Sequence, residues 1–270
     1  MVTWRALGLV VCLLSAGASR AVAQVPDTVV LEELTWTELR DLIRSGTTTI
    51  IVPIGGTEQN GPHMALGKHN VRVKALSERI ARAMGHALVA PVLAYVPEGR
   101  LSPPAGHMRF PGTITVSDET FQQVLESAAR SFKLHGFRDL VLLGDHGSTQ
   151  AGQKAVAARL NREWAATPVR VHAVEEYYRA SQIKFRELLK ARGYRDDELG
   201  THAGLTDTSL TLAIDPRMVR ADRLRRKPGL SDGDGVDGDP GRSSVELGRL
   251  GVDAVVARTV DAVKQSMMRR

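Results

Sequence analysis

One stretch of the chain decides how the rest of it folds, and it reads Ile51-Val-Pro-Ile-Gly-Gly-Thr-Glu-Gln-Asn-Gly-Pro-His-Met-Ala-Leu-Gly-Lys-His-Asn70. It begins inside an apolar, β-rich run, 48–54, which a Gly-Gly pair ends. The loop that follows carries the polar side chains Glu58, Asn60, His63 and His69. A buried strand that ends in a glycine turn and opens into carboxylates and imidazoles is how α/β proteins present metal ligands. The stretch therefore favours a metal-binding or catalytic loop over an ordinary surface loop.

Strands and helices alternate along the rest of the chain. The expected strands are 48–54, 87–96, 113–116, 139–143 and 169–174, and the expected helices are 35–46, 71–84, 117–136, 149–164, 178–192, 204–214 and 244–268. This alternation predicts a single α/β domain with a mostly parallel β-sheet flanked by helices on both faces. We find neither an internal repeat nor a linker long enough to divide the chain.

Two helix starts have specific sequence signals. Thr35-Trp-Thr-Glu38 has the form of a capping box, in which the first and last side chains each bond the other's backbone N–H. Ser117 precedes Asp118 and Glu119, whose negative charges favour the positive end of a helix.

Composition indicates a folded protein without a polyanionic partner. The chain has 270 residues, of which 43% are hydrophobic and 24% charged, and its formal net charge is +6. Because Arg5 and Arg20 lie in the N-terminal segment, the rest carries 34 basic against 30 acidic residues. We therefore expect no nucleic-acid partner.

Residues 1–23 have the pattern of a secretory signal peptide. Arg5 supplies the positive start, an apolar run follows, and Ala21-Val-Ala23 forms an A-x-A cleavage site. The apolar run is too short for a membrane anchor. We therefore expect a secreted or periplasmic protein, without membrane attachment after cleavage, whose mature domain spans 24–270.

The single cysteine, Cys12, lies in that N-terminal segment, and no small residue precedes it as in a lipoprotein signal. The mature protein would then have no cysteine, which excludes disulfides and thiolate ligands. Any metal must be held by histidine, aspartate or glutamate.

Two histidine-bearing loops, 58–69 and 145–146, directly follow expected strands. Since the carboxyl ends of parallel strands meet at one edge of a sheet, we expect the two loops to lie together. Glu58, His69 and His146 would then form a two-histidine, one-carboxylate site with open positions, suited to zinc, iron or manganese. Any one of these histidines taken singly fits a structural role better.

Other motifs are less decisive. His202 opens an expected helix, where its neutral form is favoured, so it suits either a proton-transfer role or a simple capping role. The segment 232–239 is rich in Asp and Gly but lacks the ligand order of a calcium-binding EF-hand loop, which favours a flexible loop. The chain has neither a dinucleotide fingerprint nor a G-x-S-x-G elbow.

Five motifs in order resemble the creatininase family (creatinine amidohydrolase and relatives). The stretch from Pro53 is similar to the pattern P-[VI]-G-S-x-E-Q-H-G-P-H-L-P-L-x-T-D. The others are His107-Met-Arg-Phe-Pro-Gly-Thr-Ile-Thr-Val116, Leu142-Leu-Gly-Asp-His-Gly-Ser-Thr149, His202-Ala-Gly-Leu-Thr-Asp-Thr-Ser209 and Gly235-Val-Asp-Gly-Asp-Pro240, followed by Glu246-Leu-Gly248. The resemblance implies one α/β domain, hydrolysis of cyclic or linear amide C–N bonds with divalent metals, and assembly as a homo-oligomer.

The resemblance also implies ligands, with departures. One metal would be held by Glu58, His69 and His146, and the positions of the second fall on Asn60, His69 and Ser148. An imidazole does not readily bridge two ions as a carboxylate does, and Asn60 and Ser148 are poor ligands. The sequence therefore predicts one divalent ion per chain. Asp207 stands where the family has a glutamate.

Two functions follow from these observations. The first is a secreted or periplasmic metal-dependent amidohydrolase acting on a small amide or lactam, with His202 and Asp207 moving the proton to the departing nitrogen. The second is a degenerate member that binds a small molecule or partner without catalysis, which the weakened second metal site favours.

Overall fold

The fold is built on a parallel β-sheet of four strands. The computed structural model describes residues 26–224 and 232–269, so the expected signal peptide, 1–23, lies outside the described residues. The strands are β1 (Thr49–Ile54), β2 (Ala87–Val89), β3 (Asp139–Gly144) and β4 (Arg170–Ala173), in the order β2-β1-β3-β4. All neighbours pair in parallel. The predicted α/β class is confirmed.

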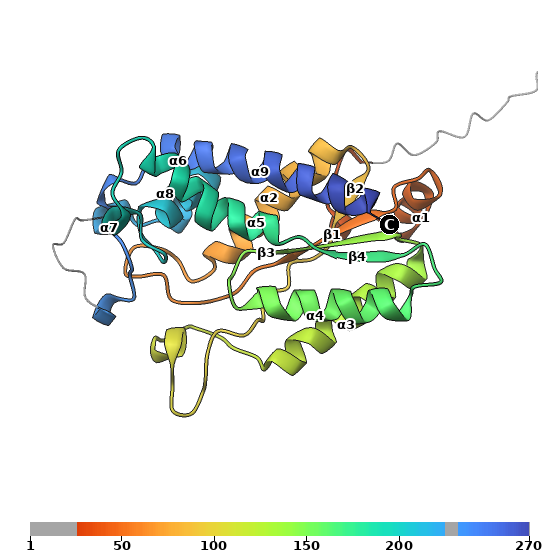
Figure 1. The fold of residues 1–270 in the computed structure, drawn as a ribbon, viewed down its shortest axis with the longest axis horizontal. Coiled ribbons are helices and arrows are strands. Elements are labelled where there is room, and N and C mark those ends of the chain that lie inside the picture. Colours follow the sequence, from red (N-terminus) through yellow and green to blue (C-terminus); the bar gives the residue numbers. More distant parts are fainter. Residues whose placement is uncertain (1–25, 225–231, 270) are drawn as a thin grey trace, which may run out of the picture.

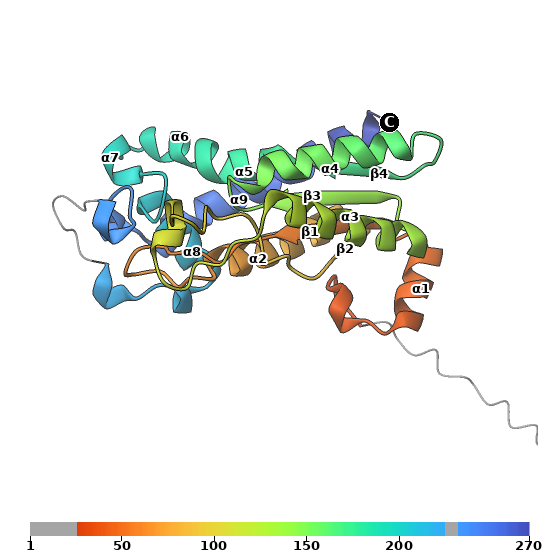
Figure 2. The same cartoon turned by 90° about the horizontal axis from the view of Figure 1, so that it is seen from below.

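Helices cover both faces of the sheet, as Figures 1 and 2 show. The α-helices are α1 (Trp36–Arg44), α2 (Lys68–Met84), α3 (Asp118–His135), α4 (Thr149–Glu163), α5 (Glu175–Arg179), α6 (Phe185–Lys190), α7 (Asp196–Leu199), α8 (Leu205–Ile214) and α9 (Val245–Met268). Helices α3 and α4 lie on one face, and α2, α5 and α9 lie on the other (Figure 1). Helices α7 and α8 lie at one end of the molecule and α1 at the other.

Each face of the sheet has its own hydrophobic core. Every residue of β1 is buried, as expected for a parallel strand covered on both sides. Ile51 packs with residues of α2 and α9, whereas the neighbouring Ile50 packs with α3 and α4. Alternate residues of a strand therefore supply opposite cores, and they fix the strand between the helical layers.

Both predicted caps are present. Thr35 Oγ1 accepts a hydrogen bond from the backbone N–H of Glu38, and Glu38 Oε2 accepts one from the backbone N–H of Thr35, at 2.7 Å. Ser117 Oγ accepts a hydrogen bond from the backbone N–H of Thr120 at 3.1 Å. These side chains satisfy backbone donors that a helix start leaves unpaired.

Several predicted boundaries were wrong. The apolar run 87–96 forms a strand only as far as Val89, and 113–116 is a loop tied by backbone bonds to Thr57 and Val96 rather than a strand. The expected helix 178–192 is present but runs from Glu175 to Lys190, as α5, a π-helical segment (Ala180–Lys184) and α6. Helix α2 begins at Lys68, three residues before the predicted start, so Lys68 and His69 lie on its first turn.

Helix α9 crosses α8 at a glycine. A Cβ atom added to Gly248 would overlap the carbonyl oxygen of Ser209 and approach Ala213. We expect Gly248→Ala to reduce the free energy of unfolding by about 1–3 kcal/mol, because overpacking forces buried backbone apart. Urea unfolding measures the change. Gln265→Ala, an exposed change on the same helix, is the control; equal stability of both variants would contradict the close contact.

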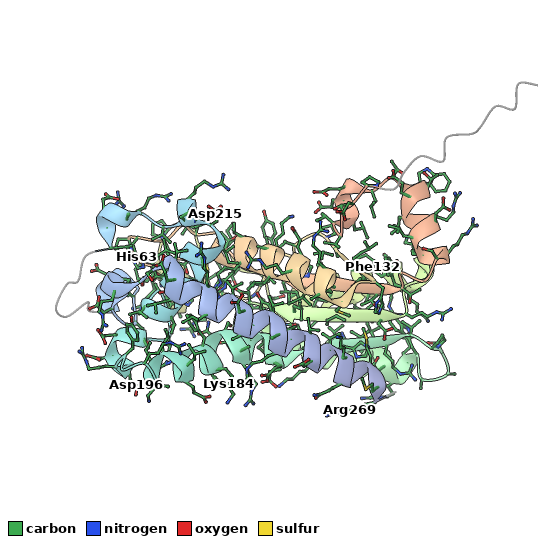
Figure 3. All side chains as sticks on the ribbon, turned by 90° about the horizontal axis from the view of Figure 1, so that it is seen from above. His63, Phe132, Lys184, Asp196, Asp215 and Arg269 are labelled. Atoms are coloured by element: carbon green, nitrogen blue, oxygen red, sulfur yellow. The ribbon has the colours of Figure 1, made fainter. Side chains whose placement is uncertain are left out.

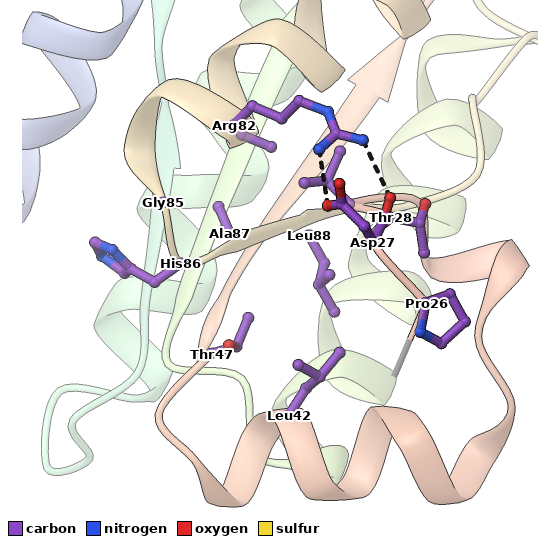
Figure 4. Close-up of a pocket in the computed structure, with 12 residues that line it drawn as sticks. Pro26, Asp27, Thr28, Leu42, Thr47, Arg82, Gly85, His86, Ala87 and Leu88 are labelled. Carbon is purple, nitrogen blue, oxygen red and sulfur yellow. Dashed lines mark hydrogen bonds and ion pairs between the residues drawn. The ribbon is translucent and has the colours of Figure 1, made fainter. Parts of the chain in front are cut away.

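A pocket of about 290 Å³ lies at the amino ends of the strands (Figure 4). Arg82 bonds both the side chain and the backbone carbonyl of Asp27 across it. Its lining offers His86 and Asp27 but no third metal-ligating side chain, so it does not resemble a metal site. No helix among residues 26–224 and 232–269 has the length and apolarity to cross a membrane.

Candidate metal centre

Polar side chains from distant parts of the chain meet at the carboxyl edge of the sheet. Ile54 and Gly144 end β1 and β3 side by side, and the backbone N–H of Asp145 donates to the carbonyl of Ile54 at 2.9 Å. The loop after β1 and the loop after β3 therefore leave the sheet together, as predicted. His63 in the first loop lies at the end of the molecule opposite Phe132 and Arg269 (Figure 3).

Glu58 is the centre of this cluster, and one of its two oxygens faces a pair of imidazoles. Its side chain is fully buried, and Oε2 accepts no hydrogen bond among the described residues. Nε2 of His146 lies 3.0 Å from that oxygen and Nε2 of His107 lies 3.2 Å from it. Ligands about 2.1 Å from a tetrahedral ion are about 3.4 Å apart, so these separations are close to those of ligands sharing one metal.

Glu58, His107 and His146 together form a possible metal site. Among the described residues, Glu58, His107 and His146 form a set of possible metal ligands whose atoms lie within 4.8 Å of one another. Of the predicted ligands, Glu58 and His146 belong to this set. The sequence analysis did not identify His107 as a ligand, although it stands at the head of one of the five motifs.

His69 approaches Glu58 from the other oxygen. Its Nε2 lies 2.7 Å from Glu58 Oε1, and its Nδ1 lies 2.6 Å from Asp145 Oδ2. Burial and Lys68 lower the pKa of His69, but the two carboxylates outweigh them and raise it. An imidazolium donates from both nitrogens and has no free lone pair for a metal. The environment therefore favours His69 as a charged partner of the carboxylates.

Two further cations of α2 extend this network. Lys68 and Arg72 both bond the carboxylate of Asp207, and Arg72 Nη2 also lies 2.8 Å from Asp145 Oδ2. The ammonium of Lys68 is 3.7 Å from Glu58 Oε1. All these side chains are almost completely buried. The chain thus places its own positive charges on the Oε1 side of Glu58 and leaves the Oε2 side to the imidazoles.

The charges of this network set the ionisation of its acids. Burial would raise the pKa of Glu58, but the positive charges of His69 and Lys68 hold it well below its ordinary value. Likewise, burial acts against Asp207, yet Lys68 and Arg72 hold the pKa of Asp207 well below its usual range. Both carboxylates are therefore anions at neutral pH.

The carboxylate of Asp207 has several hydrogen-bond and ion-pair partners. In addition to Lys68 and Arg72, it accepts a hydrogen bond from the backbone N–H of Ala203 at 2.9 Å. A carboxylate held by two cations and a backbone donor favours a structural role. Its predicted part in proton transfer stays a prediction.

The proton of His146 is placed by its neighbour Ser148. The hydroxyl of Ser148 donates to the carbonyl of Pro97 and lies 2.6 Å from His146 Nδ1. Because that hydroxyl has one proton, its oxygen accepts from Nδ1–H in the tautomer that leaves Nε2 with a free lone pair for a metal. In the other tautomer the backbone N–H of Ser148 donates to Nδ1 at 3.3 Å and Nε2–H faces Glu58, so metal binding at Nε2 selects the tautomer that the hydroxyl accepts from.

We expect Ser148→Ala to weaken zinc binding about 10–100-fold, the usual effect of removing a partner that orients a ligand. Competition with a chelating dye measures the dissociation constant. Ser127→Ala, which removes an exposed hydroxyl from α3, is the matched control. Unchanged affinity in Ser148→Ala would contradict the assignment of the His146 proton.

His107 fits the metal site with one adjustment. Gln59 Nε2 lies 3.0 Å from His107 Nδ1, and Gln59 Oε1 accepts a hydrogen bond from the backbone N–H of Gly61. With this arrangement the amide of Gln59 donates to Nδ1, and the His107 proton is on Nε2. Coordination by Nε2 requires the amide to turn over, so that its oxygen accepts from Nδ1–H at the expense of the Gly61 bond.

His202 lies beside the cluster in its neutral form. Burial, together with the charge of Lys68, lowers the pKa of His202 to about 3. Its Nε2 donates to the carbonyl of Gln59 at 2.9 Å, so the unprotonated Nδ1 is the nitrogen 3.7 Å from Glu58 Oε1. The predicted neutral state of His202 agrees with this environment.

The residues at the second-metal positions have other partners. Asn60 Nδ2 donates to the carbonyls of Glu58 and Ala65, which closes the loop onto itself, and Ser148 is bonded to Pro97 and His146. His63 is also structural, since its buried ring contacts Thr208 Oγ1 at 3.0 Å. None of these contacts provides a second group of metal ligands.

A cavity of about 190 Å³ opens beside the cluster. Its lining includes Gln59, His107, Arg109, Phe110, His202 and Val236. Gly235 brings the segment 232–239 against Gln59, where a Cβ atom would overlap the amide. This segment, expected to be a flexible loop, therefore forms one wall of the opening.

Comparison with known proteins gives consistent matches. The sequence profile of the family Creatininase (creatinine amidohydrolase) matches residues 32–263. Creatinine amidohydrolase of Pseudomonas putida is 27% identical over 209 residues, which cover 74% of this chain and 77% of that protein. A 3-dehydro-scyllo-inosose hydrolase of Thermotoga maritima is 28% identical over 72% of this chain, and a mycofactocin precursor peptide peptidase of Mycobacterium tuberculosis is 28% identical over 67%. The chain spans 58% and 64% of the lengths of these last two.

Solved structures agree in fold. A crystal structure of creatininase matches with a TM-score of 0.76 and 25% identity, over 90% of this chain and 99% of that one. A creatininase variant of Zn–Zn type is 26% identical, with a TM-score of 0.71 over 90% of this chain and 99% of its own. A manganese creatininase is also 26% identical, with a TM-score of 0.69 over 89% and 99%.

Proposed function

This chain belongs to the creatininase family, and we propose that it is a hydrolase that uses one divalent metal ion to cleave the C–N bond of a small amide or lactam. The observation that carries the proposal is the buried Oε2 of Glu58, which lies without a hydrogen bond between the imidazoles of His107 and His146. The names of the relatives support hydrolysis as the reaction class.

We propose Glu58, His107 and His146 as the metal ligands, with His107 in place of the predicted His69. One carboxylate and two imidazoles suit zinc, manganese or iron, and the relatives include zinc and manganese forms. A divalent ion held there supplies a Lewis acid and lowers the pKa of a bound water. Lys68 and His69 of α2 lie near Oε1 of Glu58. Their positive charges support a single metal ion, because they leave only Oε2 of this carboxylate for a metal.

His202 is the group that we propose to face the substrate. It lines the cavity together with His107, and its unprotonated Nδ1 is able to accept a hydrogen bond from a water or a departing nitrogen. A pKa of about 3 makes His202 a weak base at neutral pH, so it is better suited to orienting a water or the substrate by a hydrogen bond than to removing a proton. Proton transfer by His202 and Asp207 stays a prediction.

The size of the cavity supports a small substrate. Sites for drug-sized ligands usually have volumes of about 300–1,000 Å³, which is more than this opening provides. We further propose that the protein is exported through residues 1–23 and assembles as a homo-oligomer; both rest on the sequence and on the family resemblance.

The test is a metal-dependent hydrolysis screen. Mature protein is stripped with a chelator, reloaded with zinc, manganese or iron, and assayed on cyclic and linear amides by following the amine product. We expect hydrolysis of at least one small amide, only in reloaded protein. Metal binding with no hydrolysis of any amide, lactam or short peptide would overturn the enzymatic proposal.

A degenerate binding protein is the second candidate. The structural hydrogen bonds of Asn60 and Ser148 favour it, because the family's second set of ligands is replaced by residues with other tasks. This candidate predicts thermal stabilisation by a small amide without turnover, which the same screen detects when run as a melting assay.

A further inference from the structure

The strongest unassigned feature of the site is Glu98, from the loop after β2. Its side chain is buried with 4% exposed, and its backbone N–H donates to Thr115 Oγ1 at 2.9 Å, which holds the loop in place. Neither Oε1 nor Oε2 of Glu98 accepts a hydrogen bond among the described residues. Burying carboxyl oxygens that accept no hydrogen bond is costly, so this side chain is a candidate ligand.

Glu98 points into the metal centre. Its Oε2 lies 3.2 Å from His146 Nε2, the same nitrogen that lies 3.0 Å from Glu58 Oε2. Two buried carboxylate oxygens without hydrogen bonds, one from Glu58 and one from Glu98, therefore lie within 3.2 Å of the same imidazole nitrogen. Burial and the negative charge of Glu58 raise the pKa of Glu98 to about 9, and a divalent cation beside both groups would stabilise both as carboxylates.

The backbone leaves room for this carboxylate. A Cβ atom added to Gly56 would overlap Glu98 Oε1 and approach Val96. The family pattern has serine at this place, whereas this chain has glycine. Glu98 and Gly56 together therefore form a cradle that a larger residue would fill.

We propose that Glu98 is a further ligand of the metal ion, which supplies from the loop after β2 a carboxylate that Ser148 does not supply after β3. This inference rests on the proposed function, because it assumes that Glu58 and His146 hold an ion. It changes the ligand set to two carboxylates and two imidazoles.

The proposal is tested by Glu98→Gln, which keeps the shape of the side chain and removes its charge. We expect zinc affinity, measured by chelator competition, to fall by more than about 100-fold, beyond the usual effect of an orienting partner. We also expect the metal-free variant to melt at about the same temperature as wild type, because the raised pKa of Glu98 leaves its side chain uncharged at neutral pH without a metal. Gly56→Ala, which fills the cradle, should weaken zinc binding in the same direction.

The control is Glu126→Gln on α3, which should leave zinc affinity unchanged. If wild type binds zinc and Glu98→Gln binds it equally well, Glu98 is not a ligand, although the proposed function stands. Equal zinc affinity with lost hydrolysis would likewise overturn the proposal, because it would make Glu98 a proton carrier. If wild type itself binds no zinc, manganese or iron, both the inference and the proposed function fail.

Discussion

Glu58→Gln is expected to reduce hydrolysis by three or more orders of magnitude and to abolish tight zinc binding. The change removes the negative charge of Glu58. His107 and His146 lie at Oε2 of this side chain, and His69 lies at Oε1. Loss of several kcal/mol of transition-state stabilisation by a metal corresponds to a rate loss of this size. Turnover and zinc content are measured on the same preparation.

His63→Gln is the control for this variant, since His63 lies in the same loop but bonds Thr208 away from the ligands. We expect it to retain zinc. The account would be contradicted by a folded Glu58→Gln protein that keeps both its zinc and its turnover.

Arg72→Met is expected to lower the free energy of unfolding by about 3–5 kcal/mol, the usual cost of breaking a buried ion pair by removing one partner. Arg72 is completely buried and bonds both Asp145 and Asp207. Without it, each of these carboxylates stays in the interior with less compensation. Urea unfolding of the metal-free protein measures the difference.

Arg130→Met on α3 is the matched control, because Arg130 also pairs with two carboxylates, Glu126 and Glu163, but at the surface. Exposed pairs contribute about 0–1 kcal/mol. Equal losses in the two variants would show that burial of the network does not matter.

The sequence predicted the fold because its signals are local. The all-apolar β1, the capping box at Thr35 and the cap at Ser117 each act within a few residues, and the structure contains all three. Adjacency of the Glu58 and His146 loops also followed from parallel pairing alone. The run 113–116 failed because its β-branched residues serve an extended loop that has no neighbouring strand.

The start of α2 was missed for an electrostatic reason. The sequence analysis placed His69 in the loop after the strand, and cations are in any case unfavourable in the first turn of a helix. Glu58, Asp145 and Asp207 offset that penalty, and they come from three different segments of the chain. A local sequence pattern does not reveal that distant carboxylates offset the cost of these cations.

The site was only partly predictable, because it depends on which atoms face one another. Glu58 and His146 were found because each follows the end of a strand. That the two oxygens of Glu58 face different partners, however, appears only in three dimensions. His107 begins one of the five motifs that resemble the family, and that position was the signal from which it could have been identified. Glu98 gave none, since a single glutamate in a loop is ordinarily exposed.

The central claim is that one divalent ion lies against Oε2 of Glu58 and Nε2 of His146. Crystals of the mature protein grown with zinc, with diffraction data collected on both sides of the zinc absorption edge, test it most directly. The account predicts one anomalous peak per chain, in contact with both of these atoms. Zinc-loaded crystals with no peak there, or with a peak bound instead at Asn60 and Ser148, would contradict it.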